Sequence, residues 1–129
     1  MRLLLDTQIA LWWLTASPRL PRSARDLVGR AFCALSVASI WEVTLKHRLG
    51  KLAVAPEPFR DGMREAGALI LSITDVHVLG SAAFQAAHPD PFDRLLVAVA
   101  KAERLTLLTA DQALIELAGA MPGLPIQGV

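Results

Sequence analysis

Four acidic residues stand at places in the sequence where their side chains could gather at one edge of a folded domain. Asp6 directly follows a short apolar run, and Asp111 comes three residues after another. Asp93 begins a helical pattern, and Glu42 lies about two turns into a different one. Carboxylates that converge repel one another and need a highly charged cation, and hard oxygen ligands suit Mg²⁺ or Mn²⁺. A cation held in this way is suited to chemistry on phosphate esters.

Each of these acids also has an ordinary structural interpretation. A single Asp after a strand often caps the next helix, and Asp111 can cap the last helix in this way. Glu42 is harder to explain by structure alone, because its neighbours are nearly all apolar and an unpaired buried carboxylate is costly. Lys46 lies one helical turn further on and could pair with it. Both interpretations of Glu42 stay open at this point.

The sequence disfavours zinc as the metal. Its three histidines, His47, His77 and His88, do not have the spacing of a zinc motif, and Cys33 is the one cysteine. His88 precedes a proline, and a structural role suits it better than proton transfer. The metal expected here is therefore Mg²⁺ or Mn²⁺.

The elements that must position the acids alternate between strands and helices. Short apolar runs predict strands at Leu3–Leu5, Phe32–Leu35, Ala68–Ile73 and Thr106–Leu108, with an edge strand within Pro122–Val129. Helices are expected at Ile9–Leu14 (N-cap Thr7), Arg22–Arg30, 37–48 (N-cap Ser36), Pro56–Ala66, Val76–Ala87, Phe92–Arg104 and Gln112–Ala118. Strands separated by helices imply a parallel sheet covered on both faces. The prediction is a single α/β domain, residues 1–129, built as a three-layer sandwich around a central parallel sheet of four to five strands. Ligands of such sheets bind beyond the carboxyl ends of the strands.

Composition narrows the class of protein further. The chain has 129 residues, the size of one domain, and 53% of them are hydrophobic, which argues against disorder. One cysteine excludes an internal disulfide and favours a reducing compartment, so we expect a cytoplasmic protein. The longest uncharged run, Val76–Pro89, is shorter than the roughly 18 apolar residues that a membrane span needs.

Aromatic and charged residues bear on what the protein could bind. Aromatic residues make up only 5% of the chain, which argues against an aromatic platform for stacking bases. Trp12, Trp13 and Trp41 fall on helical stretches and are expected to anchor the core or an interface. Residues 1–51 hold eight Lys and Arg against three acids, whereas residues 52–129 hold five against nine. This division predicts a basic face beside an acidic one.

Four blocks of the sequence resemble a known family over almost the whole chain. The blocks are Leu3-Leu4-Leu5-Asp6-Thr7, Ser36-Val37-Ala38-Ser39-Ile40-Trp41-Glu42-Val43, His88-Pro89-Asp90-Pro91-Phe92-Asp93-Arg94-Leu95-Leu96 and Leu108-Thr109-Ala110-Asp111. They look like the signature blocks of PIN-domain ribonucleases and are especially similar to the VapC toxins of bacterial toxin–antitoxin pairs. Their order and spacing match from Arg2 to Asp111, and the Asp-Pro-Phe-Asp-Arg block is the most specific of them.

The resemblance implies a metal-dependent endoribonuclease that leaves a 3′-hydroxyl and a 5′-phosphate, with a cognate antitoxin protein as its partner. Its metal site would consist of Asp6, Glu42, Asp93 and Asp111, with Thr109 as a polar neighbour. Members of this subgroup often have His where this chain has Gln8, which leaves the carboxylates intact. The apolar composition also favours a homodimer.

Further residues are expected to act around this site. Asp90 is expected to stabilise the turn or to support the ligands from behind. Arg94 could pair with a site carboxylate or contact a phosphate, and the sequence does not decide between the two. The basic residues that we expect to contact RNA are Arg19, Arg22, Arg25, Arg30, Lys46, Arg48 and Lys51.

Other classes of protein also use an acidic pocket of this kind. A phospho-receiver signalling domain is the main alternative, but Asp6 has no acidic neighbour and Asp75 only loosely imitates the phosphorylated residue. A phosphatase of the Asp-x-Asp type is disfavoured because Gln8 stands where its second Asp would be. A binding module without catalysis would be expected to have lost one of the four acids.

Overall fold

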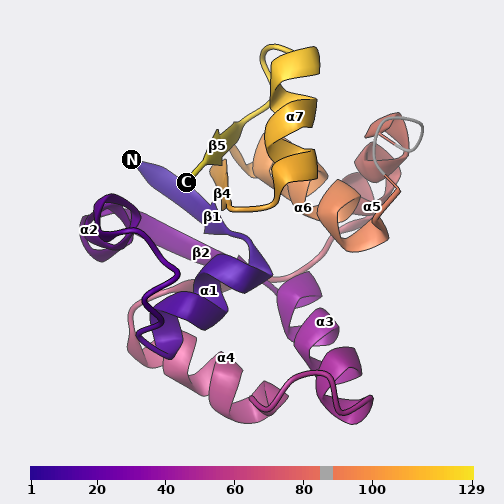
Figure 1. The fold of residues 1–129 in the computed structure, drawn as a ribbon. Coiled ribbons are helices and arrows are strands. Elements are labelled where there is room, and N and C mark those ends of the chain that lie inside the picture. The colour runs from indigo at the N-terminus through magenta and orange to yellow at the C-terminus, as the bar shows by residue number, and fades with distance from the viewer. Residues whose placement is uncertain (85–88) are drawn as a thin grey trace.

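A parallel sheet of five strands forms the centre of the computed structural model, which describes residues 1–84 and 89–129 (Figure 1). The strands are β1 (Arg2–Leu5), β2 (Phe32–Ser36), β3 (Leu69–Leu71), β4 (Thr106–Thr109) and β5 (Ile126–Gly128). They lie in the order β3-β2-β1-β4-β5, and every neighbouring pair is parallel. This confirms the parallel sheet predicted from the sequence, including the edge strand near the C-terminus.

Helices connect the strands. They are α1 (Thr7–Leu14), α2 (Arg22–Arg30), α3 (Val37–Arg48), α4 (Pro56–Glu65), α5 (Asp75–Ser81), α6 (Pro91–Glu103) and α7 (Gln112–Ala120), with a short 3-10 helix at Ala82–Phe84. Proline occupies the first helical position of α4 and α6, where its missing N–H has no partner to lose. Within the described part of the chain, no helix combines the length and apolar character needed to cross a membrane.

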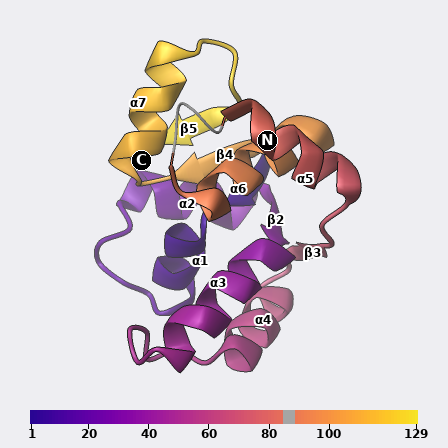
Figure 2. The ribbon, with the colours of Figure 1, turned by 90° about the vertical axis from the view of Figure 1, so that its right-hand side faces the viewer.

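Alternating side chains of β1 divide the core into two layers. Leu3 and Leu5 belong to a cluster that packs against α1, α2 and α4, whereas Leu4 belongs to a cluster on the other face that packs against α6 and α7. Successive strand residues point to opposite faces, so three consecutive leucines serve both layers. Figures 1 and 2 show the same arrangement, with the sheet between two groups of helices. The predicted three-layer sandwich is therefore confirmed.

Several predicted boundaries differ from those of the structure. The third strand is shorter than the predicted Ala68–Ile73, and the helix predicted over Val76–Ala87 ends as α5 at Ser81 before the 3-10 turn. The last residues of that prediction, and His88, lie outside the described residues. Thr7 is not the N-cap of α1 but its first residue, because the carboxylate of Asp6 accepts the Thr7 N–H at 2.8 Å.

Candidate functional site

The carboxyl ends of β1 and β4 meet at the point where the strand order reverses. From β1 the sheet continues through β2 and β3 to one side, whereas β4 and β5 lie on the other. Ligands of parallel sheets bind at such a switch point. An open pocket of about 360 Å³ lies here, lined by Asp6, Thr7, Gln8, Leu11, Trp12, Glu42, Lys46, Lys51, Leu52, Asp90, Asp93, Ala110 and Asp111. The structure thus brings all four predicted acids, together with Asp90, to one pocket.

Asp6 is the most buried of these acids. It is 6% exposed, and its two carboxylate oxygens accept from the Thr7 N–H and from the Thr109 hydroxyl at 2.8 and 2.6 Å. Burial raises the pKa of Asp6 from 3.8 to about 6, an effect that the two hydrogen bonds oppose and that the charges of Glu42 and Asp111 increase. The folded protein therefore holds this carboxylate in an environment that disfavours its charge.

Glu42 projects from α3 and has two kinds of polar partner. Its Oε2 pairs with Lys46 Nζ at 2.7 Å, and its Oε1 accepts from the hydroxyl of Thr7 at 2.7 Å. The Thr7 hydroxyl also lies 2.8 Å from the hydroxyl of Ser39, a buried residue of α3. The pairing with Lys46 that the sequence allowed is present, and it offsets the cost of placing Glu42 among apolar neighbours.

The start of α6 supplies two acids with different surroundings. Asp90 is the exposed N-cap, and its Oδ1 accepts from the backbone N–H groups of Phe92 and Asp93 at 2.8 and 3.3 Å. Asp93 lies in the first turn of the helix, is 7% exposed and lines the pocket. Arg94 donates to the backbone oxygen of Pro89 at 2.7 Å. The Asp-Pro-Phe-Asp-Arg block thus fixes its own turn and directs Asp93 inward.

Asp111 combines a capping role with exposure to the pocket. Its Oδ1 accepts the Ala113 N–H at 2.8 Å and so caps α7, as its position in the sequence suggested. Its own N–H donates to the Thr109 hydroxyl at 3.0 Å, and that hydroxyl in turn donates to Asp6. Through these two hydrogen bonds the fully buried Thr109 fixes the loop after β4 against the end of β1.

The donor set suits a hard divalent cation. Five carboxylates line the pocket, and the raised pKa of Asp6 reflects burial and the charges of neighbouring acids, which a cation would counteract. Among the described residues, no three His, Cys, Asp or Glu side chains are already arranged as a metal site. Glu42 is paired with Lys46 instead, so binding of a cation requires local side-chain rotation. The chemistry fits, while the ligand geometry is not preassembled.

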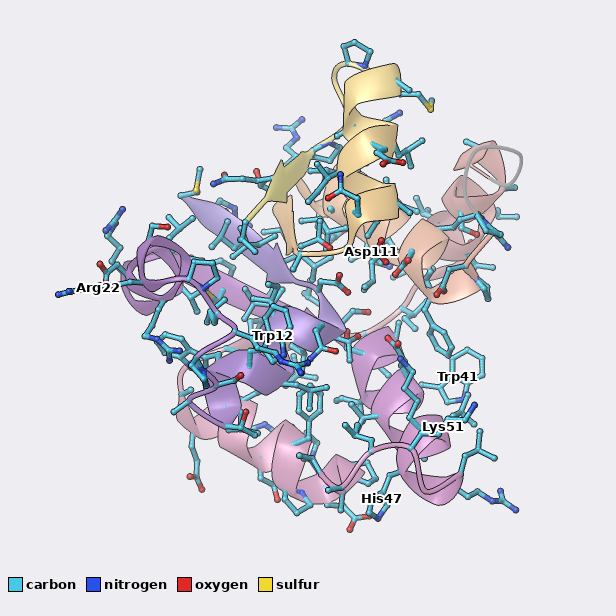
Figure 3. All side chains as sticks on the ribbon, viewed as in Figure 1. Trp12, Arg22, Trp41, His47, Lys51 and Asp111 are labelled. Carbon is cyan, nitrogen blue, oxygen red and sulfur yellow. The ribbon has the colours of Figure 1, made fainter. Side chains whose placement is uncertain are left out.

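The predicted basic contacts fall into two groups. Lys46 and Lys51 line the pocket, whereas the arginines of α2 and the loop before it do not. Arg25 donates to the backbone oxygen of Ser17 at 2.7 Å. Figure 3 shows Arg22 projecting from the outer side of α2, away from Asp111 and Lys51. Arg19 and Arg48 are exposed without lining the pocket.

Sequence reasoning missed three residues of the site. Thr7 and Ser39 form the hydroxyl pair beside Glu42, and Trp12 forms part of the pocket wall. Ser39 lies three residues before Glu42 on the same helix, so helical spacing could have placed the two together. Trp12 packs against the core, as expected. Its place in the pocket wall depends on the rotation of α1 about its axis, which the sequence does not fix.

Comparison with known proteins identifies the family. A family model described as the PIN domain matches residues 3–120, and the chain belongs to this family. This confirms the family that the four sequence blocks resemble. No curated protein sequence matches the chain.

Solved structures with a similar fold come from toxin–antitoxin complexes. VapBC2 from Rickettsia felis, crystallised with a DNA fragment from its promoter, has a chain 17% identical at a TM-score of 0.67, covering 99% of this chain and 98% of that one. DNA-bound VapBC from Salmonella typhimurium has one 16% identical at 0.69, with the same coverage. A toxin–antitoxin complex from Klebsiella pneumoniae has one 21% identical at 0.62, covering 96% of this chain and 94% of that one. These likenesses establish a shared fold along nearly the full length of both chains.

Proposed function

We propose that this protein is a Mg²⁺- or Mn²⁺-dependent endoribonuclease. The observation that carries the proposal is the gathering of five carboxylates in one pocket at the carboxyl ends of β1 and β4, in a chain of the PIN domain family. Acids at this density are tolerated where a hard cation binds, and such a cation serves the hydrolysis of phosphodiesters. The pocket is open and accompanied by two lysines, which suits a polyanionic strand rather than a small neutral substrate.

The burial and the hydrogen-bond partners of the site residues suggest a different role for each. Asp6 and Asp93, the two most buried acids of the site, would hold the cation directly. Glu42 and Asp111 would complete the binding site or orient the attacking water, and Thr109 keeps Asp6 in place. The bound cation would supply charge neutralisation for the phosphate and a lowered pKa for water. Attack in line with the leaving oxygen would leave a 3′-hydroxyl and a 5′-phosphate.

Cleavage of single-stranded RNA by the purified protein tests the proposal. We expect cleavage to stop in excess chelator and to return with Mg²⁺ or Mn²⁺. We expect Asp93→Asn to abolish cleavage and toxicity on expression while the protein stays folded and still binds RNA. Asp61→Asn, an exposed acid on α4 outside the pocket, is the matched control and should cleave normally. Wild-type cleavage in chelator, or normal cleavage by folded Asp93→Asn, would overturn the proposal.

We propose two roles for the basic residues. Lys46 and Lys51 would contact the phosphates nearest to the pocket, and Arg19, Arg22, Arg25 and Arg48 would contact more distant parts of a longer RNA. Loss of one phosphate contact makes the salt dependence of binding shallower by about one counterion. Replacing Arg22 and Arg25 by Ala should therefore weaken binding of long RNA with residual cleavage at saturation. Unchanged affinity and salt dependence would exclude the arginines from the interface.

We also propose that the protein is the toxin of a cytoplasmic toxin–antitoxin pair and forms a homodimer. The similar structures are toxin–antitoxin complexes, and α3 together with its C-cap residue carries an exposed apolar line that a partner could cover. Four residues at intervals of four form this line: Val37, Trp41, Leu45 and Leu49, exposed by 37%, 55%, 38% and 68%. An inhibitory antitoxin could insert an Arg among the carboxylates, where a bidentate pair is favourable. Light scattering that shows a stable monomer at micromolar concentration would exclude the homodimer.

Membership in the PIN domain family favours the nuclease over the phospho-receiver alternative. The geometry agrees, since Asp75, the residue that would have to accept the phosphoryl group, begins α5 and does not line the acidic pocket.

A further inference from the structure

One wall of the acidic pocket is aromatic and apolar. Thr7, Gln8, Leu11 and Trp12 lie on one side of α1, and all four line the pocket. Trp12 is half-buried and packs against the core while it also contributes to the pocket wall. Figure 3 shows Trp12 on the side of α1 that faces the viewer, with Asp111 above it and Lys51 below. An indole therefore borders the same pocket that the acids line.

The chemistry of the pocket changes along α1. Asp6 precedes the helix, whereas Trp12 lies six residues further on, which is about 9 Å at 1.5 Å per residue. Leu11 and Leu52 continue the apolar wall, and Lys51 adds a positive charge beside it. A ligand that matches this order needs a phosphate at the acidic end, a flat apolar group within roughly one nucleotide of it and a further negative charge.

We propose that Trp12 forms a subsite that stacks on an unpaired base next to the phosphate that is cleaved. Lys51 pairs with the adjoining phosphate. The inference rests on the proposed nuclease function and assigns to this site a ligand group that is aromatic rather than ionic. Single-stranded RNA presents unstacked bases to aromatic side chains, whereas a duplex hides them, so the subsite selects single-stranded loops or ends.

The other two tryptophans have different surroundings and serve as controls. Trp13, the next residue, lines a separate cavity with Val28 and Gly29. Trp41 is 55% exposed on α3 and contacts Phe92 edge-on with ring centroids 5.0 Å apart, and it does not line the acidic pocket. A general effect of losing a large aromatic side chain should therefore also appear in Trp13→Leu, whereas loss of the subsite should not.

Steady-state kinetics on a single-stranded RNA substrate tests the subsite. Stacking on an aromatic side chain is worth about 1–3 kcal/mol per base, so Trp12→Leu should raise KM by about fivefold to 150-fold while kcat stays within about threefold. Trp12→Phe should keep most of the affinity, since a ring remains. If Trp12→Leu unfolds, the abasic oligonucleotide described below keeps the inference falsifiable, because it removes the base and leaves the protein core unchanged. A wild-type KM in folded Trp12→Leu, or equal losses in Trp13→Leu, would overturn the inference.

Binding without cleavage separates this inference from the proposed function. In Asp93→Asn carrying Trp13→Phe and Trp41→Phe, Trp12 is the one remaining tryptophan, so its fluorescence reports directly on the subsite. We expect a short ribo-oligonucleotide in Mg²⁺ to quench this fluorescence, and the same oligonucleotide with one abasic position to bind at least fivefold more weakly. Quenching together with a wild-type protein that does not cleave RNA would support the subsite and overturn the nuclease.

Equal affinity for the abasic and parent oligonucleotides would overturn the subsite while leaving the nuclease intact. Trp12→Leu with normal KM for RNA but lost inhibition by a cognate antitoxin would also overturn it, and would assign this wall of the pocket to a protein partner.

Discussion

Replacing Asp6 by Asn should stabilise the metal-free protein. Asp6 is 6% exposed, and burial raises its pKa from 3.8 to about 6. Since each pKa unit corresponds to about 1.36 kcal/mol, ionisation of Asp6 costs the folded state roughly 3 kcal/mol. Asn keeps the helix cap, because it accepts the Thr7 N–H as well as Asp does. The substitution disturbs the hydrogen bond from Thr109, which lowers the gain in stability by about 1 kcal/mol. We therefore expect a net gain of about 2 kcal/mol at pH 7.5.

The gain should depend on pH in a defined direction. Below about pH 4, Asp6 is protonated in both the folded and the unfolded protein, so its charge costs nothing. Between about pH 4 and 6, the unfolded chain ionises while the folded protein does not, and the wild type loses stability as pH rises. Above about pH 6 the loss is complete and constant. The advantage of Asp6→Asn should therefore grow from pH 4 to 6 and then level off.

Urea unfolding in EDTA at several pH values measures this difference, with Asp26→Asn as the control. Asp26 is exposed on α2, and its replacement should change the free energy of unfolding by less than about 0.5 kcal/mol. Mg²⁺ should reverse the order of wild type and Asp6→Asn, because it stabilises only a protein that binds it. An Asp6→Asn variant no more stable than wild type in EDTA at pH 7.5, or a gain independent of pH, would refute the reasoning.

Three further changes test neighbouring contacts. Thr109→Val removes the hydroxyl that lowers the pKa of Asp6, so this pKa should rise further. The free energy of unfolding should fall by about 1.5–3 kcal/mol at pH 7.5 and by less at pH 5. Equal losses in urea unfolding at both pH values would contradict this. Lys46→Met frees Glu42 from its ion pair. The Mg²⁺ concentration that gives half of the maximal thermal shift should therefore fall by up to about fivefold. A rise in this concentration would show that Lys46 does not compete with the cation. Leu107→Ala opens a cavity in the fully buried centre of β4 and should cost about 2–5 kcal/mol in urea unfolding; a loss below about 1 kcal/mol would contradict the packing.

The sheet was predictable because its strands are short apolar runs with clear ends. Buried parallel strands read as continuous apolar segments, and Leu3–Leu5 stops at a charge that no central strand position would accept. The edges were less predictable. The third strand has three residues in the structure, because β3 pairs with β2 alone and little fixes its length beyond that register.

The rotation of α1 marks a limit of the sequence pattern. Six consecutive apolar residues, Ile9–Leu14, allow the helix but do not indicate which side faces the sheet. Trp12 and Trp13 are therefore equivalent in the sequence, yet they line different cavities in the structure. The start of α1 was misplaced for a related reason, since the cap at Asp6 begins the helix before its apolar pattern does.

The structural and chemical interpretations of the acids are compatible rather than alternatives. Asp6, Asp90 and Asp111 each cap a helix with one carboxylate oxygen, and all three line the same pocket. The N-termini of α1, α6 and α7 therefore point toward the pocket, and each brings a partial positive charge that favours a carboxylate. Capping explains how so many acids can be held together before any cation binds. It also fixes the direction of these three side chains, so the elements that build the fold at this edge of the sheet hold them at the pocket, whereas Glu42 must still leave Lys46 before it can contact a cation.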